Sequence, residues 1–308
     1  MQFGGQGKPS LGVIFDADMG STIDGPLGLA LLYGLQGKNE SRVLSVSTTK
    51  NSLQAAVFAD VLVRFYTGEP GPFAGAMPIG LALSGKMAAP NAMLEAVTGN
   101  PKYPRNIVKM NDTADPVALI RNALSAQFDQ NAIVVLTGPA TNLAGLLALP
   151  GSAALIEKKV RTLVVGCDAV TMSDLPAAKR VVAEWPTPIV VAGSELGDAF
   201  PFPAASIEKD FAWSQAHPVV DAYRAFRPMP YDAPAWDLLA AHYAAKPDAG
   251  FFQVSGDAGV RTLSVIPEQK DKLVAALVEL CSAKPVTPQQ RFRPPSNAAT
   301  PATPPAKK

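Results

Sequence analysis

The stretch that most constrains the fold is a largely apolar segment followed closely by three aspartates. Residues 11–15 form a run typical of a buried strand, and Asp16 and Asp18 follow it into a glycine-containing turn. Asp24 comes next, just before a helix of small apolar residues that begins near Pro26. In an open α/β sheet, ligands lie outside the carboxyl ends of the strands. This turn should therefore face the active crevice, and its carboxylates are suitable ligands for a hard cation.

The rest of the chain alternates between strands and helices. Further strands are predicted at 42–49, 132–136, 161–165 and 188–192, and AIVVL at 132–136 is typical of a strand buried in a parallel sheet. Helices are predicted at 53–66, 115–128, 143–149, 177–184, 238–245 and 268–282, and a β-hairpin at 251–265. Residues 84–112 look irregular, and the pattern weakens over 199–234. The alternation predicts a single α/β domain over residues 10–284, with a doubly wound, mostly parallel sheet and helices on both faces.

Composition and charge argue against several classes of partner. The net charge is +1 over 308 residues, so electrostatics favours neither nucleic acid nor an anionic membrane. No apolar run approaches the roughly 18 residues of a membrane-spanning helix. Cys167 and Cys281 are too few for a disulfide framework and are predicted to be buried thiols. Whether the chain forms a homo-oligomer stays an open question.

The two ends of the chain differ from the domain. Residues 1–9 are expected to be flexible, and they lack the apolar core of a signal peptide. A signal removed before residue 1 would leave no trace, so cytoplasmic and exported locations both stay open. Residues 285–308 are rich in proline and contain no acidic residue, which predicts a disordered tail.

Polar residues follow three of the predicted strands or open the helices after them. If Asp18 and Asp237 meet, they can share one Ca²⁺, which binds through roughly six to eight oxygens. A water on such an ion loses a proton more easily, and a neighbouring aspartate can accept it. Structural roles are the alternative: Asp16 can bind backbone amides in its turn, and Asp24 and Asp237 can cap helices.

The sequence resembles the inosine–uridine-type nucleoside hydrolases in four motifs that occur in the family's order. The opening stretch is similar to the family's Asp-x-Asp-x-Gly signature, followed after a longer turn by a further aspartate. VVLTGPATNLAGLLAL at 134–149 is similar to its Thr-Gly-Pro-Leu-Thr-Asn signature. DLPAAKRVVAEWPTPIVVAG at 174–193 and PAWDLLAAHYA at 234–244 resemble its later helices. The resemblance spans about residues 10–270.

This resemblance implies an enzyme that cleaves the N-glycosidic bond of a ribonucleoside or related N-riboside with a Ca²⁺-bound water, through a transition state like an oxocarbenium ion. Asp18 would be metal ligand and general base, with Asp237 and the backbone carbonyl of Thr137 as further ligands. The residues implied to bind substrate are Asp24, Asn51 and Asp168. The partner would be a small nucleoside or sugar.

The chain also departs from the family pattern, which keeps two other interpretations open. Gly25 stands where the family has a second adjacent aspartate, and Val170 where it has a ribose-binding asparagine. Trp236 stands where some members have a histidine that acts as the leaving-group acid. The same fold with an incomplete cation site could be a binding protein. Alternatively, VIFDADMGST resembles the haloacid dehalogenase signature, in which Asp16 would be the nucleophile of a phosphatase and the ion Mg²⁺.

Overall fold

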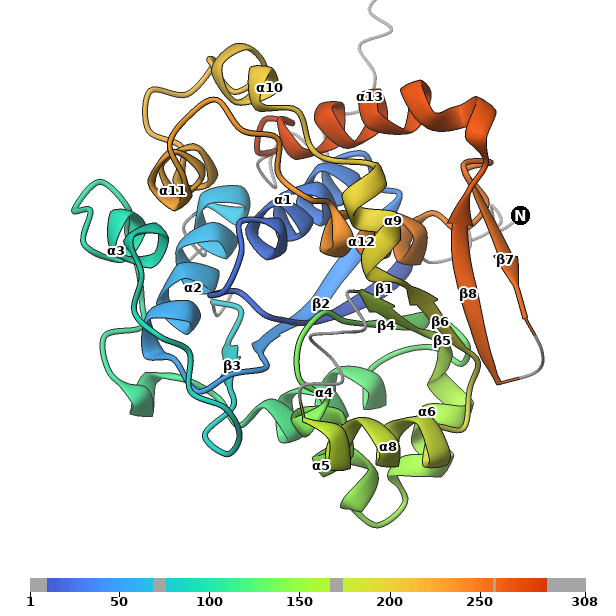
Figure 1. The fold of residues 1–308 in the computed structure, drawn as a ribbon. Coiled ribbons are helices and arrows are strands. Elements are labelled where there is room, and N and C mark those ends of the chain that lie inside the picture. Colours follow the sequence, from blue (N-terminus) through green and yellow to red (C-terminus); the bar gives the residue numbers. More distant parts are fainter. Residues whose placement is uncertain (1–9, 69–75, 167–173, 257–258, 287–308) are drawn as a thin grey trace, which may run out of the picture.

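The computed structural model describes residues 10–68, 76–166, 174–256 and 259–286, and these form one α/β domain (Figure 1). Its eight-stranded sheet has the order β3-β2-β1-β4-β5-β6-β8-β7, and every neighbouring pair is parallel except β7 with β8. The strands are β1 (Leu11–Ala17), β2 (Ser41–Thr48), β3 (Ile79–Leu81), β4 (Ala132–Leu136), β5 (Val160–Gly166), β6 (Ile189–Ala192), β7 (Phe252–Ser255) and β8 (Val260–Val265). The predicted fold class is confirmed.

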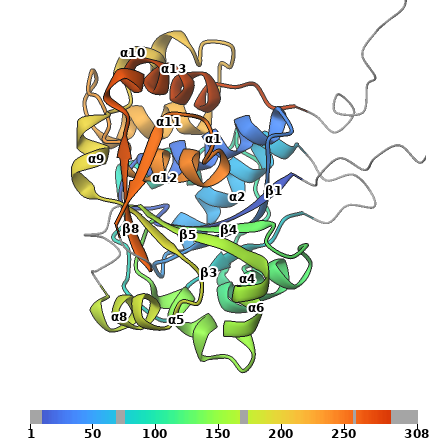
Figure 2. The same cartoon turned by 90° about the vertical axis from the view of Figure 1, so that its right-hand side faces the viewer.

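Helices cover both faces of the sheet, as the turned view shows (Figure 2). One face carries α1 (Asp24–Gly37), α2 (Leu53–Thr67), α12 (Trp236–Ala245) and α13 (Lys270–Cys281), with α3 (Ala92–Thr98) and α11 (Pro218–Phe226) packed against α2. The other face carries α4 (Pro116–Ser125), α5 (Thr141–Ala148), α6 (Ser152–Lys159) and α8 (Leu175–Glu184). The short helices α9 (Ser194–Ala199) and α10 (Ala204–Lys209) precede α11. The apolar core is thus divided by the sheet into two clusters.

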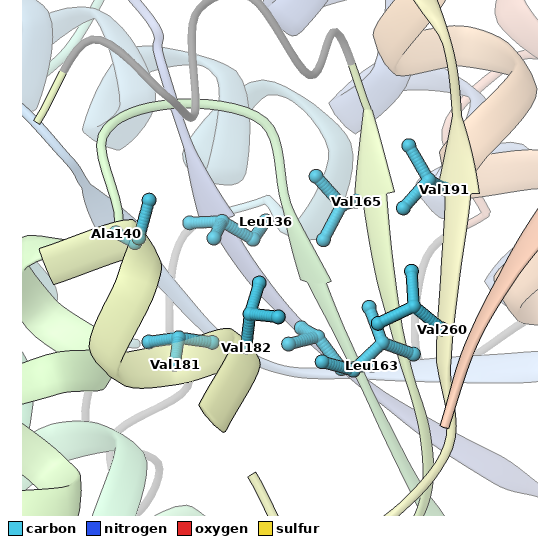
Figure 3. A pocket seen from close by; sticks show the side chains of 10 residues that line it. Leu136, Ala140, Leu163, Val165, Val181, Val182, Val191 and Val260 are labelled. Carbon is cyan, nitrogen blue, oxygen red and sulfur yellow. The ribbon is translucent and has the colours of Figure 1, made fainter. Parts of the chain in front are cut away.

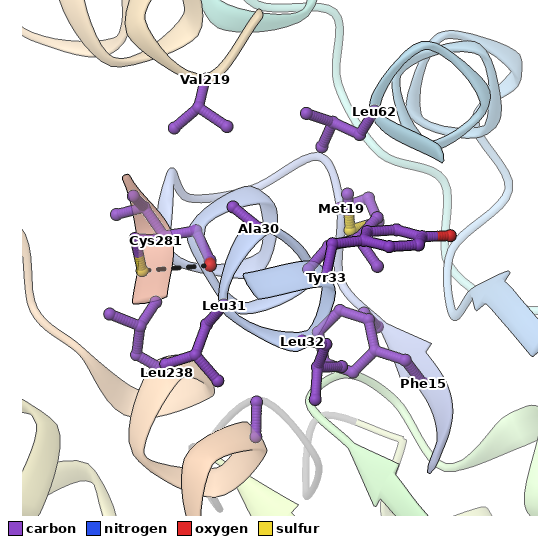
Figure 4. Packing of buried hydrophobic residues seen from close by; sticks show 14 of the residues in the cluster. Phe15, Met19, Ala30, Leu31, Leu32, Tyr33, Leu62, Val219, Leu238 and Cys281 are labelled. Carbon is purple, nitrogen blue, oxygen red and sulfur yellow. Dashed lines mark hydrogen bonds between the residues drawn. The ribbon is translucent and has the colours of Figure 1, made fainter. Parts of the chain in front are cut away.

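Helix α1 lies inside the larger of these two clusters, and almost all of its side chains are buried (Figure 4). Its glycines permit this position, because a Cβ on Gly34 would lie 2.2 Å from the carbonyl oxygen of Leu280 in α13. The thiol of Cys281 donates a hydrogen bond to the carbonyl of Leu27 at 3.5 Å. Cys281 is therefore a buried thiol as predicted, whereas Cys167 lies outside the described residues.

Two segments that the sequence left without clear elements contain helices. Within 84–112, expected to be irregular, α3 forms because Asn91 caps it by accepting a hydrogen bond from Leu94 N at 3.0 Å, and its apolar side chains are buried. Within 199–234, α10 and α11 form, and His217 caps α11 by accepting from Val219 N at 3.2 Å. The predicted hairpin is confirmed as β7 and β8. Residues 1–9 and 287–308 lie outside the described residues.

Candidate active site

The candidate site lies where the strand order reverses. Strand β1 pairs with β2 on one side and with β4 on the other, so the turns after β1 and β4 leave the sheet side by side at its carboxyl edge. The backbone N–H of Asp18, after β1, donates to Oγ1 of Thr137, after β4, at 3.3 Å. Such a switch point is where open α/β sheets bind ligands. The turn after the first strand therefore lies where the sequence predicted it.

Asp18 forms an ion pair that the sequence reasoning missed. Its Oδ2 lies 2.6 Å from Nζ of Lys50, and the same Nζ lies 2.5 Å from Oγ of Ser21. The Asp18 side chain is 6% exposed and the Lys50 side chain 17%, so the pair is largely shielded from solvent. Lys50 follows β2, whose carboxyl end adjoins that of β1. The sequence could have indicated this pair, because Lys50 follows a predicted strand and the carboxyl ends of neighbouring parallel strands meet at one edge of the sheet.

Asp24 caps a helix distant from it in sequence. Its Oδ2 accepts a hydrogen bond from the backbone N–H of Asp237, and its Oδ1 accepts from that of Leu238 at 3.3 Å. These N–H groups open α12, where a carboxylate is favoured by the helix dipole. Burial raises the pKa of Asp24 to about 7, and the backbone hydrogen bonds partly oppose this rise. Both oxygens are thus engaged, and the predicted contact with ribose hydroxyls stays a prediction.

Asp237 is the third of three neighbouring buried carboxylates, after Asp18 and Asp24. Burial, and next the negative charge of Asp24, raise the pKa of Asp237 well above its usual range, and a hydrogen bond from the Thr137 side chain lowers it. The hydroxyl of Thr137 therefore joins Asp237 to the backbone of Asp18. The Lys50 ammonium also favours ionised Asp237. The predicted metal-ligand role of the Thr137 carbonyl stays a prediction.

Asp16 is a structural residue beneath the site. It is fully buried, and its Oδ1 accepts hydrogen bonds from Ser47 Oγ at 2.6 Å and Asn142 Nδ2 at 2.8 Å. Burial raises its pKa to about 6, opposed by these two hydrogen bonds. These contacts agree with the expected structural role, except that the donors are side chains and not the expected backbone amides. Asp16 has no surface exposed to solvent, which argues against the nucleophile role that the phosphatase interpretation gives it.

Asn51 holds a loop at the rim of the site. Its Nδ2 donates to the carbonyl of Leu83 at 3.0 Å, and its backbone N–H donates to the carbonyl of Lys86 at 2.9 Å. The side chains of Leu83 and Met87 are largely exposed in this loop. The substrate contact predicted for Asn51 stays a prediction, and Asp168 and Val170 lie outside the described residues.

Two further residues discussed from the sequence have structural contacts. Trp236 donates from Nε1 to the carbonyl of Ser194 at 2.7 Å and packs against Gly197, where a Cβ would overlap its ring. His242 is buried in α12 beside Phe251 and Phe252. Neither contact suggests a proton donor for a leaving group.

The donors around Asp18 do not fit a calcium ion well. A Cβ on Gly25 would lie 2.8 Å from the carbonyl oxygen of Asp18 and 3.3 Å from Oδ2 of Asp237, so the backbone fills the space through which a carboxylate would enter. Both oxygens of Asp24 accept backbone N–H groups, and Lys50 contacts Asp18. Over the described ranges, no group of three or more His, Cys, Asp or Glu side chains is arranged to hold a metal. Calcium binding stays a prediction that these donors do not support.

A separate apolar cavity of about 70 Å³ lies between α8 and strands β4 to β6, on the other face of the sheet (Figure 3). Val165, Val182, Val191 and Val260 are among its lining residues, and the described residues that line it are all apolar. None of these described residues has a side chain that could carry out chemistry. In the part of the chain that the structure describes, we find no helix with the length and apolar character needed to span a membrane.

Comparison with known proteins agrees with this architecture at low sequence identity. No protein-family model matches the chain, and no curated protein matches it. An inosine-uridine preferring nucleoside hydrolase from Bacillus anthracis is similar in structure, with a TM-score of 0.64 and 18% identity over 88% of this chain and 99% of that chain. A purine-preferring ribonucleoside hydrolase from Gardnerella vaginalis has a TM-score of 0.64 and 15% identity over 88% and 98%.

A third similar structure is the type III effector protein XopQ complexed with adenosine diphosphate ribose. Its TM-score is 0.66, with 14% identity over 90% of this chain and 95% of that chain. The sheet order and the switch-point site define an open, doubly wound α/β protein. Among such proteins, this chain has the fold of the nucleoside hydrolases, and the predicted resemblance is confirmed at the level of fold.

Proposed function

We propose that the protein binds a nucleoside or a related N-riboside at the carboxyl edge of its sheet. The observation that carries the proposal is the Asp18–Lys50 pair at the switch point, with the shielded carboxylate of Asp237 nearby. A carboxylate accepts hydrogen bonds and an ammonium donates them, so together they suit the vicinal hydroxyls of a ribose. The named nucleoside hydrolases and the ADP-ribose complex of XopQ support a ribosyl ligand for this fold.

Hydrolysis of the N-glycosidic bond is the second candidate, and the carboxylate of Asp18 at the switch point favours it, because a carboxylate can accept a proton from water. In this reaction a water oxygen attacks C1′ of the ribose while Asp18 accepts a water proton. The bond between C1′ and the base nitrogen breaks, the electron pair leaves with the base, and the base takes up a proton from solvent. Lys50 occupies Oδ2 of Asp18, and Oδ1 accepts a long hydrogen bond from the backbone N–H of Gly20 at 3.4 Å, so Oδ1 is the oxygen left to accept the proton. Binding without turnover is our primary proposal.

Titration calorimetry with inosine, uridine, ADP-ribose and ribose tests the proposal, and assays for released ribose test the second candidate. We expect at least one riboside to bind, and its affinity to fall in Asp18→Asn. Asp129→Asn is the matched control, because Asp129 is exposed and lies before β4, at the opposite edge of the sheet. If none of the four compounds binds the wild-type protein, the proposal is wrong. Ribose release that Asp18→Asn abolishes would establish the hydrolase instead.

A further inference from the structure

The positive charge beside Asp18 comes from a side chain of the protein itself, that of Lys50. Lys50 Nζ lies 2.6 Å from Asp18 Oδ2, about the distance at which Ca²⁺ would bind a carboxylate oxygen. The ammonium and a metal ion bound to this oxygen would therefore compete for the same acceptor at a similar distance. A divalent ion and an ammonium so close together on one carboxylate would repel each other strongly.

The backbone holds Lys50 in this position. Oγ1 of Thr48 donates to the carbonyl of Lys50 at 3.2 Å, and the next residue, Asn51, is joined to the rim loop through the carbonyl of Lys86. At the other end of the side chain, Ser21 and Asp18 both contact Nζ. Lys50 is thus held at its backbone and at its ammonium, and its side chain is 17% exposed.

The oxygens around Lys50 Nζ suit an ammonium, which has one positive charge and donates hydrogen bonds, better than they suit a calcium ion. An ammonium needs only acceptors for its N–H groups, whereas Ca²⁺ takes about six to eight oxygens. Gly25 contributes no oxygen from a side chain, and the oxygens of Asp24 already accept the N–H groups of Asp237 and Leu238. The carboxylates left near Asp18 are too few for a calcium site while the ammonium is present.

We propose that Lys50 is a built-in cation: its ammonium supplies the positive charge beside Asp18 that a bound metal would otherwise supply, and it excludes divalent ions from this edge. The site therefore needs no bound metal to supply this charge. Removing the ammonium frees Asp18 to bind a divalent cation together with Asp237. This inference concerns the cation alone and does not depend on which riboside binds, or on whether one binds.

Calcium titration by calorimetry of the full-length, metal-stripped protein tests the proposal. Wild-type protein should show no saturable Ca²⁺ binding up to millimolar concentration. Lys50→Met should show saturable Ca²⁺ binding, at least about tenfold tighter than the millimolar limit set for the wild type, because one positive charge has been removed from beside the ion. Its Tm should also rise with Ca²⁺. Adding Asp18→Asn to Lys50→Met should abolish both gains.

Two controls separate position from charge. Lys50→Arg keeps the positive charge at this place and should gain no Ca²⁺ affinity. Lys86→Met removes the same charge from an exposed lysine on the rim loop and should also behave like the wild type. Saturable wild-type Ca²⁺ binding that Asp18→Asn abolishes would overturn the proposal, as would a folded Lys50→Met protein without the gain. If Lys50→Met does not fold, Lys50→Gln, which can still hydrogen-bond Asp18 and Ser21, is judged by the same results.

Discussion

Replacing Asp16 by asparagine tests directly whether this carboxylate is buried in the folded protein. In the folded protein its pKa is about 6, against 3.8 for an exposed carboxyl. The folded state therefore holds the proton more tightly, and wild-type protein gains stability from this group as pH falls through 6 toward 3.8. Asparagine has no such titration. From pH 8 to pH 5, wild-type stability should therefore rise relative to Asp16→Asn by roughly 1.4 kcal/mol.

Urea unfolding followed by tryptophan fluorescence at several pH values measures this difference. The variant keeps an oxygen that Ser47 and Asn142 can donate to, so its fold should persist. Contributions from other titrating groups are common to both proteins and cancel in the comparison. A stability difference that does not change between pH 8 and pH 5 would mean that Asp16 titrates like an exposed carboxyl, and the assignment of Asp16 as a buried structural group would be refuted.

Three other predictions follow from buried contacts, all measured by chemical or thermal unfolding. Asn142→Ala should destabilise the protein by about 2–3 kcal/mol, since Asp16 and the Thr48 carbonyl both lose a buried donor; a loss below about 0.5 kcal/mol would contradict this. Gly34→Ala should cost about 2–3 kcal/mol, because the added Cβ overlaps the Leu280 carbonyl; an unchanged Tm would argue against the α1–α13 packing. Burial lowers the pKa of His217 from 6.5 to about 3, so the unfolded chain takes up this proton first as pH falls. From pH 8 to pH 5, wild-type stability should fall by about 2 kcal/mol relative to His217→Asn, whose side chain can still cap α11, and a constant difference would contradict the burial.

The sheet could be predicted because its central strands carry their own signal. The runs at 11–15 in β1 and at 132–136 in β4 contain no polar side chain because both faces of these strands are covered, and each run is followed by polar residues. Helix α3 could not be predicted in this way. It has seven residues, and its stability depends on packing against α2 and α11, which the local sequence does not reveal.

The site was predictable in position but not in its contacts. Asp18 follows a central strand, so topology alone brings it to the carboxyl edge beside Thr137. The contact between Asp24 and the first N–H groups of α12 joins residues more than 200 positions apart, and no local pattern indicates it. Lys50 was missed because sequence reasoning assigned the positive charge at this edge to a metal and did not consider a neighbouring strand.

The central claim is that this edge binds a riboside without calcium. Calorimetric titration of the metal-stripped protein with inosine, uridine and ADP-ribose, in the presence of a chelator and again with millimolar Ca²⁺, tests it most directly. We predict that at least one compound binds and that its Kd is the same in both conditions. Binding that occurs only with Ca²⁺ would contradict the role given to Lys50, and the absence of binding in both conditions would contradict the proposed function.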